Sequence, residues 1–273
     1  MRKALFIFIV VALFLPNLFN KDINPRPPFN RIEDFDPRLA YINSVEKLET
    51  HIDSIAVSQH IAAGSYDYVL IAETVTKKRF YHGFSHFTLK ENWLAAVMGR
   101  CCEEGLACKV QPEDIMQHSN AACSQQSIVL MALLRKKNIT YRKIGFPHHY
   151  AMEVMIDKDW YFFDADMEPL ITKAQRMESS WKHQADLLKP YYDTKRYSDL
   201  DYKFGVGLTV TTGTINEVPA PRAKIFQAAT GILSKILWCL PLLFILFRPS
   251  FSFRPLLSFP FVRKNNSPSL ATA

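Results

Sequence analysis

Cys123 is the residue of this sequence with the clearest capacity for nucleophilic chemistry. It comes three residues after Asn120, and a strongly apolar stretch follows it and ends in basic residues. Asn120 at the start and the basic residues at the end predict one helix, from about Ala121 to Lys137. Cys123 would then lie in the first turn, where the free N–H groups and the helix dipole favour a thiolate. A cysteine near a helix start is, by itself, more often a small buried apolar residue.

His149 and Asp164 can supply the base and the orienting group that a thiol nucleophile needs beside it. His149 begins a stretch of alternating character at 149–156, and Asp164 ends a β-rich stretch at 160–164. The residues between them, 157–159, predict a turn. The two stretches therefore predict a pair of antiparallel strands with one candidate residue at each outer end.

The length of the connecting loop decides whether His149 and Asp164 can meet, because residues two apart share a face of a strand. With an even number of loop residues, the two side chains project from the same side of the sheet. A two-residue loop places Asp164 opposite Ala151 or Glu153, and opposite Ala151 it would be the diagonal neighbour of His149. A three-residue loop without a bulge would put them on opposite faces. His148 is the alternative base, and it would face the other way.

The elements that must hold these residues are helices followed by strands. Helical periodicity covers 41–62, 66–81 and 90–102, ahead of the central helix. A further strand is predicted at 140–145. The order of helices, one central helix and then an antiparallel sheet predicts an α+β domain.

The pattern over about residues 79–169 resembles the transglutaminase-like superfamily. A cysteine heads a Leu-rich helix, an arginine follows on a strand, a histidine comes four residues before a glutamate, and a tryptophan comes four residues before an aspartate. The residues that carry the resemblance are Cys123, Arg142, His149 with Glu153, and Trp160 with Asp164. The combination is specific, whereas each spacing alone is weak.

The resemblance implies a papain-related cysteine-protease core, with the central helix packed on the antiparallel sheet. It implies Cys123 as nucleophile, His149 as general base and Asp164 as the carboxylate that orients the base. Members of the family attack an amide carbonyl and form a thioester, which an amine or water then resolves. The residues around Cys123 differ from the Gly-Gln-Cys-Trp signature of the animal enzymes, so they do not indicate glutamine–lysine crosslinking. Bacterial-type relatives, which include proteases and amidases, fit better.

An oxyanion hole is also required, and two N–H groups are candidates. One is the backbone N–H of Cys123. The other is the indole of Trp93, which lies upstream as a tryptophan does in the family, although such a residue is often part of the core. Gln125 and Gln126 would line the cleft or face solvent. Arg142 would pack or pair near the site and could contact substrate.

No metal and no cofactor is predicted. His82 and His86 have the i, i+4 spacing of helical metal ligands, but no third ligand accompanies them, and we interpret them as packed or exposed. Asp164, Asp166 and Glu168 have oxygen ligands suited to a divalent ion. Solvated carboxylates at a strand end are the preferred interpretation. The sequence shows no calcium-site pattern.

The net charge of +7 does not indicate nucleic-acid binding, because much of the excess lies beside apolar segments. Arg2 and Lys3 precede the first apolar run, and basic residues without acids follow the last one, as in cytoplasmic loops of membrane proteins. The first run begins at Ala4 and predicts an uncleaved anchor. The last run, 225–247, is long enough to cross about 30 Å of hydrocarbon and predicts a transmembrane helix, with a buried or interfacial amphipathic helix as the alternative.

These segments give the predicted domain organisation and compartment. The divisions are a signal anchor at 1–20, a linker at 21–40, the transglutaminase-like domain at 41–218, a linker at 219–224, the transmembrane helix at 225–247 and a basic cytoplasmic tail at 248–273. The domain would lie on the periplasmic or extracellular side of the cell membrane, which is oxidising. Cys101, Cys102 and Cys108 could form at most one disulfide there, and Cys123 would stay a free thiol.

The leading functional prediction is a membrane-tethered cysteine acyltransferase or amidohydrolase that acts on a protein or peptide substrate. A papain-like protease shares the triad and differs in the acceptor. The competing class is a non-catalytic module of the same fold that binds peptide or glycan at the cell envelope. The sequence does not indicate an oligomeric state.

Overall fold

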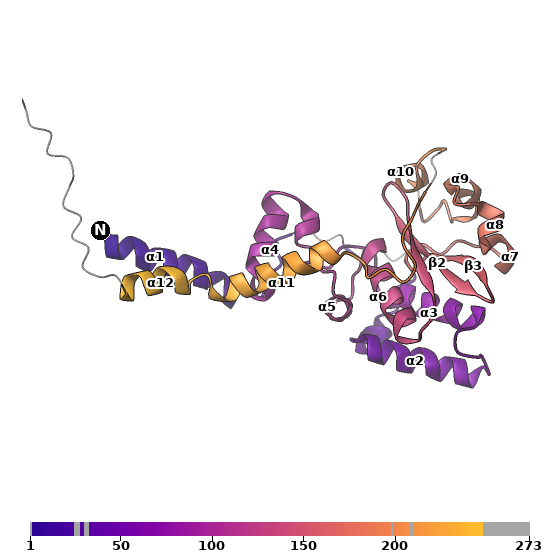
Figure 1. Cartoon of the computed structure of the whole chain (residues 1–273), viewed down its shortest axis with the longest axis horizontal. Coiled ribbons are helices and arrows are strands. Elements are labelled where there is room, and N and C mark those ends of the chain that lie inside the picture. The colour runs from indigo at the N-terminus through magenta and orange to yellow at the C-terminus, as the bar shows by residue number, and fades with distance from the viewer. Residues whose placement is uncertain (1, 25–27, 30–32, 198, 208–209, 248–273) are drawn as a thin grey trace, which may run out of the picture.

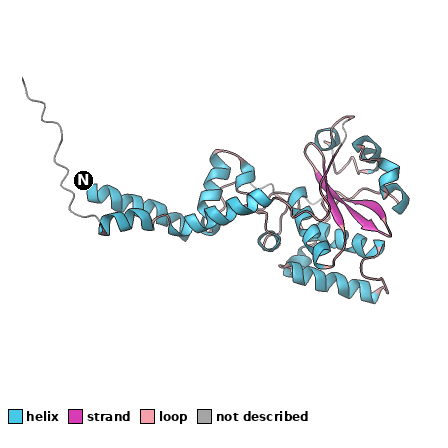
Figure 2. Cartoon of the chain, viewed as in Figure 1, coloured by secondary structure: helices cyan, strands magenta, loops and turns pink. Residues whose placement is uncertain are grey.

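A four-stranded antiparallel sheet with the strand order β3-β2-β1-β4 lies at the centre of the part that carries Cys123. The strands are β1 (Tyr141–Gly145), β2 (Tyr150–Ile156), β3 (Asp159–Phe163) and β4 (Thr211–Thr212). The computed structural model of the chain describes residues 2–24, 28–29, 33–197, 199–207 and 210–247. The sheet and the helices around it confirm the predicted α+β class (Figure 2).

The turn between β2 and β3 contains two residues, 157–158, and both have positive φ angles, of 53° and 77°. Positive φ at both central positions is the requirement of one of the tight two-residue hairpin turns. The register that follows pairs Met152 with Phe163. Asp164, one residue further on, therefore continues the ladder on the same side of the sheet as His149.

Helices cover both faces of this sheet (Figure 1). One face packs through Met152 and Val154 against the long helices. These are α2 (Val45–Ser58), α3 (Tyr66–Arg79) and α6 (Cys123–Lys136), with the short α5 (Pro112–Met116) beside them. The other face packs through Phe162 against a layer around Trp181. Its short helices are α7 (Lys173–Arg176), α8 (Glu178–Trp181), α9 (Ala185–Leu188) and α10 (Leu200–Phe204). We call the sheet with all these helices the head.

The start of α6 is fixed by Gln125, which lies in its first turn. The Gln125 Oε1 accepts hydrogen bonds from the backbone N–H groups of Ala122, at 3.3 Å, and Ser85, at 2.8 Å. The Gln125 amide donates to the backbone oxygens of Ser85 and Lys109, at 3.0 and 2.8 Å. A side chain that satisfies orphan groups at a helix start fixes where the helix begins. Gln125 therefore sets the position of Cys123 relative to two neighbouring segments.

An elongated helical arm extends from the head (Figure 1). It consists of α1 (Arg2–Phe14), η1 (Leu15–Leu18), α4 (Leu89–Cys101), η3 (Glu104–Leu106), α11 (Pro221–Ile236) and α12 (Cys239–Leu246). At its far end α1 lies against α12, where the ring centroids of Phe6 and Phe244 are 5.1 Å apart. Nearer the head, α11 packs along α4.

The interface between α11 and α4 corrects the predicted transmembrane helix. Within the described ranges no helix is long and apolar enough to cross a membrane. The apolar run divides into α11 and α12, and α11 buries polar residues against α4. Thr230 Oγ1 accepts from the Asn92 amide at 2.9 Å, and Ser234 donates to Asn92 Oδ1 at 2.9 Å. Gln227 donates to the Cys108 backbone oxygen at 2.6 Å. The prediction was wrong because it took the run at 225–247 as a single lipid-facing helix.

Two other predictions concern the cysteines and the ends of the chain. All five cysteines are free thiols, so Cys101, Cys102 and Cys108 form no bridge, and Cys123 is among the free ones as predicted. The predicted basic tail at 248–273 lies outside the described residues. The outer side of a membrane as the compartment of the head stays a prediction.

The packing of α4 against η3 gives a stability prediction. A Cβ added at Gly99 would overlap the Cβ of Ala107 and lie 2.9 Å from the Ala107 backbone nitrogen. We expect Gly99→Ala to lower the free energy of unfolding by about 1–3 kcal/mol, as overpacking does. Gly231→Ala is the matched control in α11, because its Cβ would meet only Asn92 Nδ2, at 3.8 Å. Chemical denaturation followed by circular dichroism compares the two, and equal stability would contradict the expectation.

Candidate functional site

His149 and Asp164 meet where the register of the hairpin places them. His149 Nε2 donates to Asp164 Oδ2 at 2.7 Å, and both side chains are fully buried. The same carboxylate accepts from the Tyr192 hydroxyl, at 2.8 Å, and from the Met167 N–H, at 3.0 Å. Its own backbone N–H donates to Glu73 Oε1 at 2.5 Å. Asp164 is therefore held from several directions and in turn fixes the orientation of the imidazole.

The electrostatics of this pair follow from burial and from the partners. Burial lowers the pKa of His149, but the Asp164 carboxylate and Cys123 raise it by more, so the net pKa lies well above the ordinary value. Burial raises the pKa of Asp164, while His149 and the hydrogen-bond donors around the carboxylate lower it by more. Each partner thus favours the charged form of the other.

Cys123 lies on the other side of the same imidazole. The Cys123 sulfur, a ring nitrogen of His149 and a carboxylate oxygen of Asp166 all lie within 4.8 Å of one another. Because Asp164 occupies Nε2, the nitrogen left for the sulfur is Nδ1. That nitrogen is buried and has no hydrogen-bond partner among the described residues. Cys123 itself is half-buried at the start of α6.

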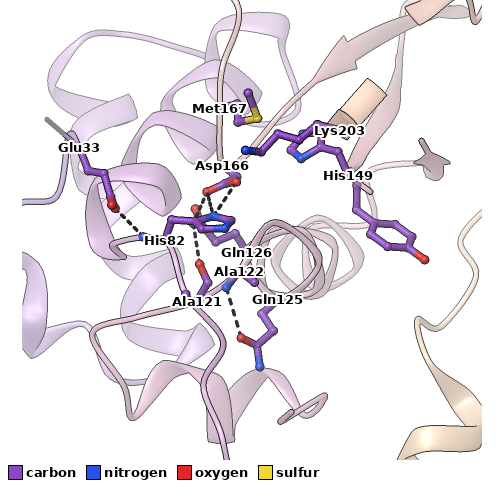
Figure 3. A network of polar contacts seen from close by, with 12 residues as sticks. Glu33, His82, Ala121, Ala122, Gln125, Gln126, His149, Asp166, Met167 and Lys203 are labelled. Atoms are coloured by element: carbon purple, nitrogen blue, oxygen red, sulfur yellow. Dashed lines mark hydrogen bonds and ion pairs between the residues drawn. The ribbon is translucent and has the colours of Figure 1, made fainter. Parts of the chain in front are cut away.

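A second histidine–aspartate pair, His82 with Asp166, lies beside Gln126 (Figure 3), and a carboxylate oxygen of Asp166 is within 4.8 Å of the Cys123 sulfur. His82 Nδ1 lies 3.0 Å from Asp166 Oδ2, and the Gln126 amide donates to Asp166 Oδ1 at 2.8 Å. Asp166 raises the pKa of His82 to about 9, against the effect of burial, and Cys123 adds to the increase. His82 is brought here by pairing between its neighbour Tyr81 and the segment just before α6. The imidazole of His82 is therefore a cation near neutral pH at the edge of the site.

A pocket of about 150 Å³ opens beside the second pair. His82, Gln126 and Asp166 form part of its wall. The remaining lining residues are Glu33, Asp34, Lys77, Phe80, Met167, Arg196, Tyr197 and Lys203. Charges of both signs face this space, and the carboxylate of Asp166 in its wall lies within 4.8 Å of the Cys123 sulfur. A substrate group would reach the sulfur from this side.

The other predicted site residues have different positions. The structure does not bring Trp93 to the site, because its indole N–H donates to the Ser234 backbone oxygen in the arm, at 2.9 Å. Arg142 pairs with Glu153, at 2.6 Å, and with Glu178, at 3.0 Å, and does not line the pocket. These contacts leave Arg142 in an ion-pair cluster on the sheet.

Gln126 lies at the site but not as an oxyanion donor. Its two amide hydrogens go to the Ala121 backbone oxygen, at 2.9 Å, and to Asp166. The backbone N–H of Cys123 stays a candidate, because the first N–H groups of a helix have no acceptor within the helix. His148 is exposed and stacks on Tyr202, with ring centroids 3.9 Å apart. It therefore faces away from the sulfur, as the strand alternation predicts.

Comparisons with models of protein families, with curated proteins and with solved structures find no match to this chain. The resemblance to the transglutaminase-like superfamily therefore stays a prediction that rests on the residues of this sequence alone.

Proposed function

We propose that this chain carries out acyl transfer through a thioester on Cys123, with peptide or protein amides as the substrate class. The observation that supports this best is the state of the His149 ring. Its Nε2 is held by Asp164, and its Nδ1 is buried, without a hydrogen-bond partner among the described residues, and directed to the side where the sulfur lies. A nucleophile, a base and a group that orients the base are the parts that such a mechanism needs.

The steps follow from these positions. The Cys123 thiol first gives its proton to Nδ1 of His149, which forms a thiolate–imidazolium pair. The sulfur then forms a bond to the carbonyl carbon as the carbon–oxygen π bond breaks. The same proton moves to the leaving nitrogen as the carbon–nitrogen bond breaks, which leaves a thioester. Water or an amine then attacks the thioester, gives a proton to His149, and the carbon–sulfur bond breaks as the sulfur regains a proton. Asp164 stabilises the imidazolium during each transfer and does not take the proton itself.

An activated ester tests the proposal without knowledge of the natural substrate. With p-nitrophenyl acetate in chelator-treated buffer, we expect a burst of about one nitrophenolate for each protein molecule, because acylation precedes slower deacylation. Peptide mass mapping should find the acetyl group on Cys123. If amines resolve the thioester, a primary amine added as acceptor should shorten the lifetime of the acetyl-enzyme. If only water resolves it, the added amine should leave that lifetime unchanged.

Cys101→Ala is the control for the burst, because Cys101 is an exposed thiol outside the site. It should leave the burst unchanged, while Cys123→Ala should abolish it. A burst that survives in Cys123→Ala would contradict the proposal. The absence of a burst in the unmutated chain would favour the non-catalytic binding module.

A further inference from the structure

We propose that Cys123, His149 and Asp166 form a binding site for one thiophilic divalent cation such as Zn²⁺. The ligand atoms of these three side chains, one sulfur, one ring nitrogen and one carboxylate oxygen, lie within 4.8 Å of one another. Sulfur, imidazole nitrogen and carboxylate oxygen are the ligand types that Zn²⁺ takes in proteins. This site was not predicted from the sequence, which indicated no metal.

The distances leave only a small adjustment for coordination. Metal–ligand bonds of about 2.0–2.3 Å place tetrahedral ligands about 3.3–3.8 Å apart. From separations of at most 4.8 Å, the three atoms need to approach by no more than about 1.5 Å. The half-buried Cys123 lies in the first turn of α6, and Asp166 lies in a turn after β3, where Gln126 and His82 hold its carboxylate.

The groups behind the ligands already have the arrangement that metal sites use. A histidine ligand almost always donates its second ring N–H to a carboxylate, a backbone carbonyl or water, which fixes its tautomer. His149 does so to Asp164 at 2.7 Å, and its Nδ1, the nitrogen for the metal, is buried without a partner among the described residues. The carboxylate ligand is held in the same way, because Asp166 accepts from Gln126 at 2.8 Å.

The ligand set gives the site one open position. Three protein ligands leave the fourth position of a tetrahedral ion to water or another ligand. Asp166 lines the pocket described above, so solvent can reach this position. Binding releases to solvent the proton that Cys123 and Nδ1 of His149 share, because both the sulfur and this nitrogen must be free of it to bind the ion. The inference rests on the geometry of the three side chains and not on acyl transfer, and a loaded site would block the thioester because it occupies the same sulfur and nitrogen.

A cobalt titration tests the site directly. The chain is stripped with chelator and carries Cys101→Ala and Cys102→Ala, because two adjacent exposed thiols could bind metal themselves. We expect Co²⁺ to produce a sulfur-to-metal charge-transfer band that saturates at one ion per chain, and Zn²⁺ to displace it. Cys123→Ala should abolish the band. Asp164→Asn, which removes the carboxylate behind the histidine ligand, should weaken binding about 10–100-fold.

His148→Ala is the matched control, since this exposed histidine is the sequence neighbour of His149 and points away from the sulfur. It should bind Co²⁺ like the parent. A titration without the band, or a band unchanged in Cys123→Ala, would overturn the inference. A second measurement needs no variant of the site. Zn²⁺ should protect Cys123 from iodoacetamide in the parent chain, and labelling of Cys123 at the same rate with and without Zn²⁺ would contradict the site.

The outcomes separate this inference from the proposed function. Metal binding in a chain that gives no nitrophenolate burst after stripping would contradict acyl transfer and leave the metal site standing. A burst that Zn²⁺ does not suppress would contradict the metal site and leave acyl transfer standing.

Discussion

Replacing His149 with alanine is expected to slow the alkylation of Cys123 by iodoacetamide by up to about 30-fold at pH 7, because an ordinary cysteine with a pKa of about 8.5 is only about 3% thiolate at that pH. The reason is geometric, because Nδ1 of His149 is the base directed at the sulfur, and Asp164 holds the ring in that orientation. Mass spectrometry of the Cys123 peptide over time gives the rate on the chelator-stripped chain. Labelling of the exposed Cys101 in the same sample serves as the internal reference.

His148→Ala is again the control for this experiment. Its side chain is exposed and stacked on Tyr202, so its loss should change the rate for Cys123 little. Asp164→Asn should slow the reaction less than His149→Ala, because it disturbs the orientation of the base and does not remove it. Equal slowing in the two histidine variants would refute the assignment of His149 as the base.

The second large effect is expected on stability, from Arg176→Met. Arg176 is almost fully buried, forms an ion pair with Glu168, and lies 3.8 Å from the buried Glu73. It also donates to the Phe162 backbone oxygen at 2.9 Å. Removing one partner of a buried charge network costs about 3–5 kcal/mol, because the remaining charges lose their compensation. Denaturant titration should show a loss of this size in the free energy of unfolding.

The neighbouring carboxylates allow a sharper form of this test. Burial and then Glu168 raise the pKa of Glu73 well above its ordinary value. Arg176 opposes this increase, so its loss raises the pKa of Glu73 further and favours the neutral acid, while the Glu168 carboxylate loses its ion-pair partner. Adding Glu168→Gln to Arg176→Met should therefore recover part of the lost stability. Arg38→Met, at an exposed ion pair with Asp36, is the control and should change the midpoint little. If Arg176→Met lowers the free energy of unfolding no more than Arg38→Met does, the buried charge network does not contribute to stability.

The histidine–aspartate contact could be anticipated because it depends on local rules. Strand alternation puts His149 and Asp164 on one face when the loop has an even number of residues, and the turn at 157–158 meets this condition. The sequence left the register open, since two different pairs of turn residues were possible. The positive φ angles of those two residues, which the structure shows, decide between them.

The second pair at the sulfur could not be anticipated, because no periodicity extends to it. Asp166 follows the end of β3, where alternation no longer determines a direction. His82 is positioned by a single pairing between Tyr81 and Asn120, which are distant in the sequence. Such a contact depends on the tertiary arrangement of segments and leaves no local pattern. The interpretation of His82 as packed or exposed therefore did not identify Asp166 as its partner.

The wrong transmembrane prediction has a related cause. Mean hydropathy over 225–247 averages the residues on all sides of a helix. It therefore carries no information about which side the few polar residues occupy. Gln227, Thr230 and Ser234 follow one another at helical spacing, and they form a single buried stripe along α11. That stripe binds Asn92 and the Cys108 backbone in the arm. The polar residues of this run thus pack against α4, which the length and apolar character of the run did not indicate.

The contact of α1 with α12 has a consequence for the order in which the chain assembles during synthesis. Phe6 leaves the ribosome long before Phe244, its stacking partner. At about 5–20 residues per second, roughly ten to fifty seconds separate the two. During that interval all the strands and helices of the head are synthesised, whereas α1 has no α12 to pack against. The far end of the arm is therefore the last part to form, and an interruption of synthesis before α12 would release a chain with a finished triad and an open arm.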